Sequence, residues 1–322
     1  MFKWKKLGKL FDPTKIENKN WMKEYAQAAS VLIFDDYIRV YFSCRSAPDE
    51  KGKYVSYMAY IDLNKNNLFD IINIADKPIL ELGELGTFDE FGTNPASVIK
   101  VGNEIRIYYC GWSRCESVPF NSAIGVAFSH DNGNTFVKLG KGPIISYSPD
   151  EPFLLGSPKI RYFNGIWSLW YAAGSKWIDN NGSPEPVYKI KLATSPDGIH
   201  WTKHGKNLID IKLEENECQA SPDVFFYNNK YHMIFSYRYS IGYRSKDFSY
   251  RIGYASSDDL LNWVRDDSKA GITISDEGWD SEMISYAHVF EFNNNRYMIY
   301  QGNGFGKYGI GLAILENSVH SS

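Results

Sequence analysis

The sequence lacks several features that would indicate particular classes of protein. No apolar run is long enough to span a bilayer, and residues 1–13 have neither the apolar stretch nor the cleavage site of a signal peptide. With a formal net charge of −3, the chain also lacks the basic stripe expected of a nucleic-acid-binding protein. We therefore expect a cytoplasmic protein with no membrane span and no nucleic-acid partner.

Cysteine and cofactor motifs are equally scarce. The four cysteines have neither the spacing of a zinc site nor the density of a disulfide scaffold, so we interpret them as buried small side chains. No glycine-rich phosphate loop leads from a predicted strand into a helix, and no Gly-x-Ser-x-Gly motif is present. The sequence thus predicts no metal and no cofactor.

Apolar and aromatic residues are abundant, at 43% and 16% of the chain, which is enough to bury a sizeable core. No segment shows a sustained helical period. The stretches KLGKLFDP (6–13) and DLLNW (259–263) fit single helical turns at most. This pattern favours an all-β protein.

A hairpin pattern recurs five times along the chain. Each copy has a small residue, a short apolar strand, a turn rich in Asp, Asn or Gly, and a second strand rich in Tyr, Phe, Trp and Ile. The copies start at Ala29, Ala96, Ser157, Ser221 and Ala287, roughly 61 to 67 residues apart. Another alternating run follows each hairpin, so one period holds about four strands, as one propeller blade does.

We predict an all-β fold: a five-bladed β-propeller with four-stranded antiparallel blades around a central channel, with residues 1–322 as a single domain. A blade cannot bury both faces alone, whereas blades packed radially can. A β-sandwich of several sheets is the alternative, because periodic hairpins do not by themselves prove radial closure.

Three turns share a serine, an aspartate two residues later and an aromatic residue six or seven positions after the serine: SHDNGNTF, SPDGIHW and SSDDLLNW. The first resembles the Asp-box of sialidases. Such an aspartate can accept hydrogen bonds from turn amides while the aromatic ring fills the gap between sheets. We therefore interpret Asp131, Asp197 and Asp259 as structural.

Acidic residues precede all five predicted innermost strands: Glu24, Asp89 and Glu90, Glu151, Glu217, and Asp280 with Glu282. Partly buried carboxylates that converge on one mouth raise the pKa of one of their number, and cleavage of a glycosidic bond uses one protonated acid and one base or nucleophile. We predict that Glu217 is the general acid, that Glu24 or Glu90 is the base or nucleophile, and that Glu282 shapes the site.

Further residues near these loops are candidates for binding substrate. Trp112 and Trp279 could stack on a sugar ring, and Asp89 and His288 could contact its hydroxyl groups. These four side chains predict a carbohydrate partner. A purely aromatic core is the alternative for Trp279.

Three arginines, Arg45, Arg114 and Arg238, follow the second strand of their hairpins. Their planar guanidinium groups could bind a phosphate or a sugar carboxylate at a shared rim. Ion pairs with the acids named above are the alternative interpretation.

The five-fold pattern, the S-x-D-G-x-x-W turn and the acids before the inner strands resemble the five-bladed propeller glycoside hydrolases of families 32, 43, 68 and 130, over nearly the whole chain. Glu217-Cys218, with Pro222-Asp223 after it, is similar to the Glu-Cys-Pro-Asp stretch that carries the acid in family 32, with three more residues between. The stretch WMKEYAQAAS (21–30), which leads into the first predicted inner strand, has no Asp-Pro motif. Glu24 is the nearest residue to the nucleophile or base of those families.

Residues 278–313 resemble uncharacterised propeller proteins associated with bacterial surface-polysaccharide synthesis. The resemblances imply a glycoside hydrolase-like enzyme that acts on a glycosidic bond in surface-polysaccharide or glycoconjugate metabolism. Two alternatives stay open: a non-catalytic carbohydrate-binding propeller, and a phosphorylase or glycosyltransferase on the same scaffold, with arginines that bind phosphate.

Overall fold

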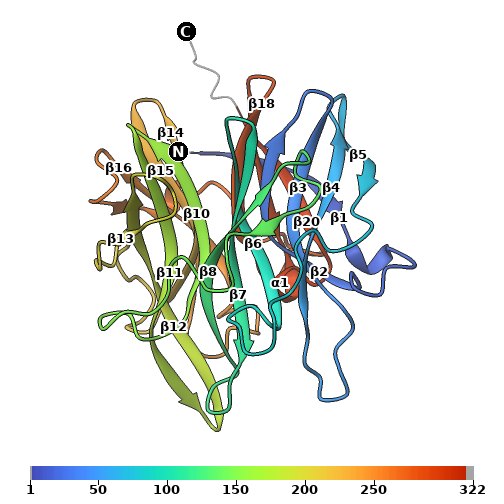
Figure 1. The fold of residues 1–322 in the computed structure, drawn as a ribbon. Helices are drawn as coiled ribbons and strands as arrows, with labels where there is room; N and C mark the ends of the chain where they lie inside the picture. Colours follow the sequence, from blue (N-terminus) through green and yellow to red (C-terminus); the bar gives the residue numbers. More distant parts are fainter. Residues whose placement is uncertain (1, 317–322) are drawn as a thin grey trace.

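The computed structural model describes residues 2–316, and β-strands make up most of it (Figure 1). Hydrogen bonds group the strands into five successive antiparallel blades. The innermost strands contact one another in a closed ring, in the order β2, β6, β10, β14, β18 and back to β2. This radial closure confirms the predicted five-bladed propeller and excludes the sandwich.

Each blade has four strands, ordered here from the innermost to the outermost. They are β2 (Glu24–Ile33), β3 (Tyr37–Arg45), β4 (Ser56–Asn64) and β5 (Asn67–Ile74) in blade 1; β6 (Gly92–Val101), β7 (Glu104–Arg114), β8 (Phe120–Ser129) and β9 (Val137–Lys138) in blade 2; β10 (Leu155–Phe163), β11 (Ile166–Asn180), β12 (Ser183–Ser195) and β13 (Thr202–Lys203) in blade 3; β14 (Cys218–Tyr227), β15 (Lys230–Arg238), β16 (Arg251–Ser257) and β17 (Val264–Arg265) in blade 4; β18 (Ser285–Phe292), β19 (Asn295–Gln301), β20 (Ile310–Leu315) and β1 (Trp4–Phe11) in blade 5.

The fifth blade is completed by the first strand of the chain. Strand β1 pairs antiparallel with β20, with Trp4 opposite Leu315 and Phe11 opposite Ile310. The sequence prediction of at most a helical turn over residues 6–13 is therefore wrong for most of this stretch, because its hydrogen-bond partners lie at the other end of the described chain. A short 3-10 helix follows at Pro13–Lys15.

A few elements depart from the regular blade pattern. A single parallel bridge between Ser56 and Gly92 joins blades 1 and 2 into one continuous sheet. One-turn helices occur at Asp267–Lys269 and at α1 (Asn303–Gly306), while residues 259–263 form bends without a helix. Residue 1 and residues 317–322 of the predicted single domain lie outside the described residues.

The Asp-box turns hold neighbouring blades together, as their pattern predicts. Asp131 Oδ1 accepts hydrogen bonds from the backbone N–H groups of Asn134 and Thr135, both at 3.0 Å. The following Phe136 is buried and packs edge-on against Tyr41 of blade 1, with ring centroids 5.9 Å apart. Asp131 thus shapes a turn whose aromatic residue fills the space between two sheets.

Two glycines in these turns let the neighbouring blade approach closely. Tyr41 Oη donates to the carbonyl of Gly133 at 3.2 Å, and Tyr108 Oη donates to that of Gly198 at 2.9 Å. A Cβ at Gly133 would stand 2.0 Å from Tyr41 Oη, and both glycines have a positive φ. Any other residue there would both clash and strain the backbone.

All five innermost strands contain a register shift near their beginning. Four of these bulges include a residue with positive φ: Ala28, Ser157, Ser221 and Tyr286. A bulge bends its strand and changes the direction of the side chains beside it. Bulges at equivalent places therefore shape one end of the central channel.

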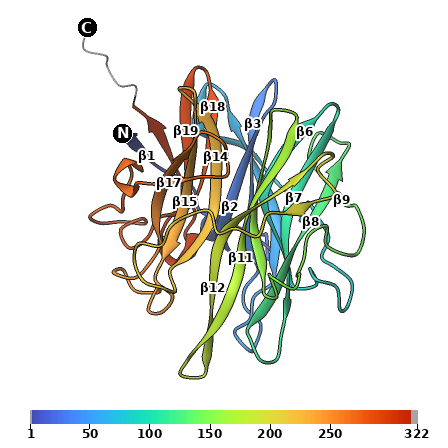
Figure 2. The same cartoon turned by 90° about the vertical axis from the view of Figure 1, so that its left-hand side faces the viewer.

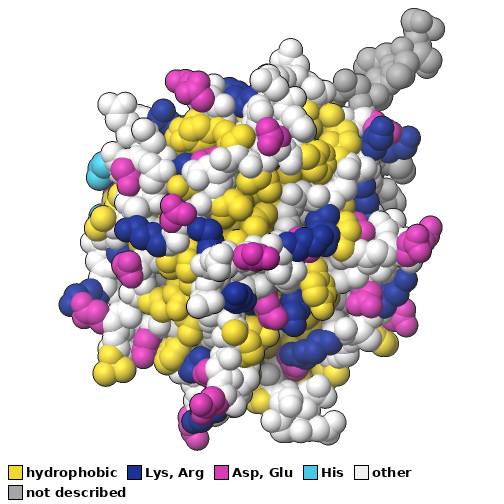
Figure 3. Space-filling view, turned by 90° about the vertical axis from the view of Figure 1, so that its right-hand side faces the viewer, with side chains coloured by type: hydrophobic (Ala, Val, Ile, Leu, Met, Phe, Trp, Pro, Cys, Tyr) yellow, Lys and Arg dark blue, Asp and Glu magenta, His cyan; other side chains and the backbone are white. Residues whose placement is uncertain are grey.

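Charged side chains of both signs are interspersed over the face drawn in Figure 3, as expected from the small net charge. Between residues 2 and 316, no helix combines the length and hydropathy required to cross a membrane.

Candidate functional site

A cavity of about 800 Å³ lies where the innermost strands begin, and side chains from all five blades line it. Examples are Arg45, Trp112, Glu185, Arg238 and Tyr286, one from each blade in order. Strands β11 and β12 extend beyond their neighbours as a long hairpin, visible in Figure 2, and residues 182–186 of that hairpin form part of the wall.

Four of the acids that precede the inner strands are buried in ion pairs and do not line the cavity. Each pairs with a cation on the outermost strand of its own blade: Asp89 with Lys138 (2.6 Å), Glu151 with Lys203 (2.8 Å), Glu217 with Arg265 (2.6 Å) and Asp280 with Lys6 (2.6 Å). All four acids are at most 3% exposed. The repeated acid therefore fixes the loop before each inner strand to the outer edge of the blade.

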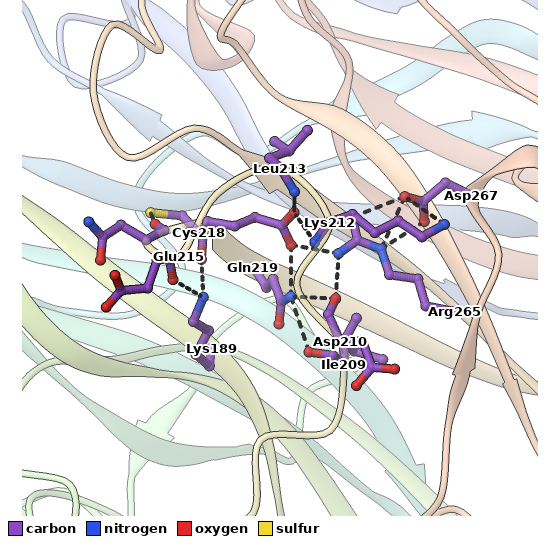
Figure 4. A network of polar contacts seen from close by, with 12 residues as sticks. Lys189, Ile209, Asp210, Lys212, Leu213, Glu215, Cys218, Gln219, Arg265 and Asp267 are labelled. Atoms are coloured by element: carbon purple, nitrogen blue, oxygen red, sulfur yellow. Dashed lines mark hydrogen bonds and ion pairs between the residues drawn. The ribbon is translucent and has the colours of Figure 1, made fainter.

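Glu217 shows why such an acid cannot reach a ligand in the cavity. Its carboxylate accepts hydrogen bonds from the backbone N–H groups of Lys212 and Leu213, from Gln219 Nε2 and from Arg265 Nη1, at 2.6 to 3.1 Å. Figure 4 shows Arg265 extending from this network to Asp267. The predicted general acid is thus a fully paired internal group, and its position fits a structural role.

The other three predicted catalytic acids also lie outside the lining of the cavity. Glu24 is at the rim, where it accepts from Tyr54 Oη at 2.9 Å and pairs with Lys307 at 3.2 Å. Glu90 Oε2 accepts from the backbone N–H of Gly86 at 2.9 Å, and Glu282 is exposed. The structure does not bring these acids together as a catalytic pair.

The predicted binding residues divide into two groups. Arg45, Trp112, Arg114 and Arg238 line the cavity. Trp279 instead stacks on Tyr300, with ring centroids 5.4 Å apart, and covers Gly302 and Gly311 inside blade 5. Its alternative interpretation as part of an aromatic core fits this position. Asp89 and His288 are buried away from the cavity lining.

His288 belongs to a buried charged cluster formed by the innermost strands. Its Nε2 accepts from the backbone N–H of Val31 at 3.1 Å, so the proton of the neutral ring is on Nδ1, which lies 3.3 Å from Asp223 Oδ2. Arg161 donates to the other oxygen of Asp223 at 2.5 Å, and Lys159 Nζ lies 3.4 Å from Nδ1. This cluster ties blades 1, 3, 4 and 5 together next to the axis.

The cluster predicts a specific dependence of stability on pH. Burial and the Lys159 ammonium lower the pKa of His288 to about 4, against the attraction of Asp223, whereas its unfolded pKa is about 6.5. Between these values the unfolded chain binds the additional proton, so the stability of the fold decreases as the pH falls from about 6.5 to about 4, by about 3 kcal/mol. Urea unfolding at both ends of this range will measure the change.

His288→Gln, which removes the titrating ring, is expected to flatten this part of the pH profile while the carboxylates continue to titrate. Asp223, Lys159 and Arg161 remain in place as the charged neighbours. Wild-type and variant profiles that run parallel between pH 4 and 6.5 would contradict the assignment.

Glu185, on β12, is a site residue that the sequence analysis did not identify. Among the described residues that line the cavity, it is the one with a carboxylate. Its oxygens accept from Tyr243 Oη at 2.5 Å and from Arg244 Nη1 at 2.6 Å, both in the loop between β15 and β16. The only sequence signal was its place between Pro184 and Pro186 in an unusually long hairpin. Over residues 2–316, no group of three or more His, Cys, Asp or Glu side chains is arranged to hold a metal ion.

The closed ring of five blades with a cavity at one end defines the propeller fold of the glycoside hydrolases. A structure from the GH130 family of mannoside phosphorylases, described as containing glycoside hydrolases that target β-1,2 mannosidic linkages in Candida mannan, superposes with a TM-score of 0.72. The match covers 98% of this chain and 93% of that chain at 14% identity. Enzymes of families 32 and 43 share the fold, as the sequence resemblance predicts.

The chain belongs to the family of the uncharacterized protein Rv1502 of Mycobacterium tuberculosis. The two sequences are 33% identical over 315 residues, which is 98% of this chain and 99% of that protein. A β-1,2-mannobiose phosphorylase of Thermoanaerobacter sp. is 27% identical over 136 residues, 39% of this chain and 43% of the phosphorylase. No family model matches the sequence.

Proposed function

We propose that this protein is a carbohydrate-active enzyme that acts on a glycosidic bond in the cavity, with the whole chain as one propeller domain. The observation that carries the proposal is the position of Glu185, a carboxylate in a cavity lined by aromatic and polar side chains from every blade. The cavity volume of about 800 Å³ is typical of small-ligand sites.

The lining suits a sugar ring. Trp112 and Phe120 offer aromatic faces for the C–H groups of a ring, while Gln27, Asn94 and Gln301 offer amide groups for hydroxyls. Glu185 can accept a sugar hydroxyl or transfer a proton to the leaving oxygen, and Tyr243 and Arg244 fix its orientation. Following the resemblance of residues 278–313, we place the reaction in the metabolism of surface polysaccharides or glycoconjugates in the cytoplasm.

The described residues place a single carboxylate, that of Glu185, in the cavity wall, which favours phosphorolysis as the second candidate. Hydrolysis in most glycosidases uses two carboxylates, one as acid and one as base or nucleophile. In phosphorolysis a phosphate oxygen forms the new bond to the anomeric carbon as the glycosidic C–O bond breaks, and the leaving oxygen takes the proton that a protonated Glu185 carboxyl transfers to it. Phosphate therefore replaces the second carboxylate. The arginines in the cavity and the similarity to a β-1,2-mannobiose phosphorylase support this candidate.

The test is to incubate the wild-type protein with aryl pyranosides, aryl furanosides and β-1,2-mannobiose, with and without inorganic phosphate. We expect release of the aryl group or of a monosaccharide from at least one substrate. Product formation that requires phosphate, with a glycosyl phosphate as co-product, indicates phosphorolysis, and turnover without phosphate indicates hydrolysis. Absence of turnover in every arm, with saturable binding of a saccharide, contradicts the enzyme and favours a carbohydrate-binding propeller.

A further inference from the structure

Two arginines in the cavity have no carboxylate within ion-pairing distance among the described residues. Arg114 and Arg244 do have such partners, since Arg114 pairs with Asp49 at 3.3 Å and Arg244 with Glu185 at 2.6 Å. Arg45 and Arg238 line the same cavity without one. The alternative interpretation, in which the arginines form ion pairs with the predicted acids, is therefore wrong for Arg45 and Arg238.

Arg238 is the more deeply buried, at 2% exposure. Its Nε donates to Tyr188 Oη at 3.2 Å, and its Nη1 donates to the carbonyls of Tyr239 and Ser240 at 2.8 and 3.3 Å. The guanidinium plane lies over the ring of Tyr243, with Cζ 3.6 Å from the centroid. All of these partners are neutral, so they orient the cation without balancing its charge.

Arg45, at the end of β3 in blade 1, is held in a similar way. Its Nη2 donates to Gln27 Oε1 at 3.2 Å, and its Nε is buried without a hydrogen-bond partner. The guanidinium lies over the rings of Tyr25 and Tyr54, with Cζ 4.2 and 5.3 Å from the centroids. Burial lowers the pKa of this guanidinium.

Tyr286 lines the same cavity as the two arginines. Its ring packs edge-on against Tyr250, with ring centroids 5.8 Å apart. The residue occupies the bulge of β18 with φ of 54°, where the equivalent bulges of blades 1, 3 and 4 have the smaller residues Ala28, Ser157 and Ser221. A tyrosine in this conformation costs free energy, and such strain is commonly found at ligand sites.

A buried cation without an anion is unfavourable, and two that face one cavity repel each other. We propose that Arg45 and Arg238 form an oxyanion subsite, which binds a phosphoryl or carboxylate group of a reactant. The inference rests on the proposed function, because the subsite lies in the same cavity. It adds that one reactant bound there carries a negative charge. The negative charge arrives with the ligand and balances both arginines, while Tyr286 offers a hydroxyl group in the same cavity.

The test is calorimetric titration of the full-length protein with inorganic phosphate, glucose 1-phosphate and glucuronate, with neutral glucose as the reference ligand. We expect saturable binding of at least one anion. Because each arginine supplies charge-assisted hydrogen bonds, Arg45→Gln and Arg238→Gln should each weaken it by about tenfold to 100-fold. Arg106→Gln is the matched control, because Arg106 lies outside the cavity and pairs with Glu104 at 2.9 Å. It should bind as the wild type does.

Thermal unfolding distinguishes loss of the subsite from loss of the fold. Since Arg45 has no carboxylate partner, Arg45→Gln should melt at the wild-type temperature or above it without ligand, while the increase in melting temperature caused by the anion disappears.

The ligands that bind distinguish the sources of the negative charge. Binding of phosphate alone identifies a free phosphate reactant, whereas binding of only glucose 1-phosphate or glucuronate places the charge on the sugar. Wild-type protein that binds none of the anions, or variants that bind them equally well, would overturn the subsite. Anion binding without turnover leaves the subsite intact and counts only against the proposed enzyme.

Discussion

Glu217→Gln is expected to destabilise the protein by about 3 to 5 kcal/mol, the usual cost of breaking a buried ion pair on one side. The glutamine has nearly the shape of glutamate but leaves Arg265, whose side chain is 1% exposed, without its closest carboxylate. Two backbone N–H groups also lose a charged acceptor. Urea unfolding at neutral pH will measure the loss.

The control for this variant is Glu84→Gln, which removes an ion pair with Lys141 at the surface and should cost under about 1 kcal/mol. Folded Glu217→Gln should keep its turnover in the glycoside panel, because its carboxylate has no contact with the cavity. A variant of wild-type stability with turnover reduced 100-fold would restore Glu217 as the general acid and contradict the structural role.

Glu185→Gln is expected to reduce kcat by about 10² to 10⁴ on whichever substrate is turned over, since a positioned proton donor or acceptor contributes that much to the rate. The fold should remain intact, because the Arg244 side chain left behind is 66% exposed and stays solvated. Steady-state kinetics and thermal unfolding of the same preparation measure both effects.

Tyr243→Phe is the companion variant, because it removes one hydrogen bond to Glu185 and leaves the carboxylate in place. A smaller reduction in kcat is expected than for Glu185→Gln, with a shifted pH profile. Glu24→Gln, at the rim, should preserve most of the activity if Glu185 carries the proton. Unchanged turnover in Glu185→Gln would remove the central support for the proposed function.

The propeller could be predicted because most blades are formed by strands that are consecutive in the sequence. Short stretches of sequence specify the hairpins and Asp-box turns, and the recurrence of these stretches indicates how many blades there are. Strand β1 could not be identified in this way. Its register is interrupted around Gly8, which has a positive φ, and its partner strand β20 begins at Ile310. Pairing over such a separation leaves no local pattern.

The sequence indicates where these acids lie along the chain. It does not indicate toward which part of the fold their side chains point. A residue just before a strand can point into the channel or toward the outer edge of its own blade. The sequence shows the position of the residue but not which of the two directions its side chain takes. The cations that decide the question, such as Lys138 and Arg265, lie 49 and 48 residues further on in strands of two residues each. Glu185 could not be predicted because it lies on the third strand of a blade, whereas the acids considered as candidates lie in the loops before the first strands.

The pairing of β1 with β20 also sets an order of events during synthesis. Strand β1 leaves the ribosome before any of the blades, yet β20, its sheet partner among residues 2–316, emerges after four blades and most of the fifth. Until then both β1 and the growing edge of blade 5 are open strands, the kind that pair with other chains. A ribosome stalled before Ile310 would hold a chain with four complete blades whose strand β1 has no β20 to pair with, so the fifth blade would stay incomplete.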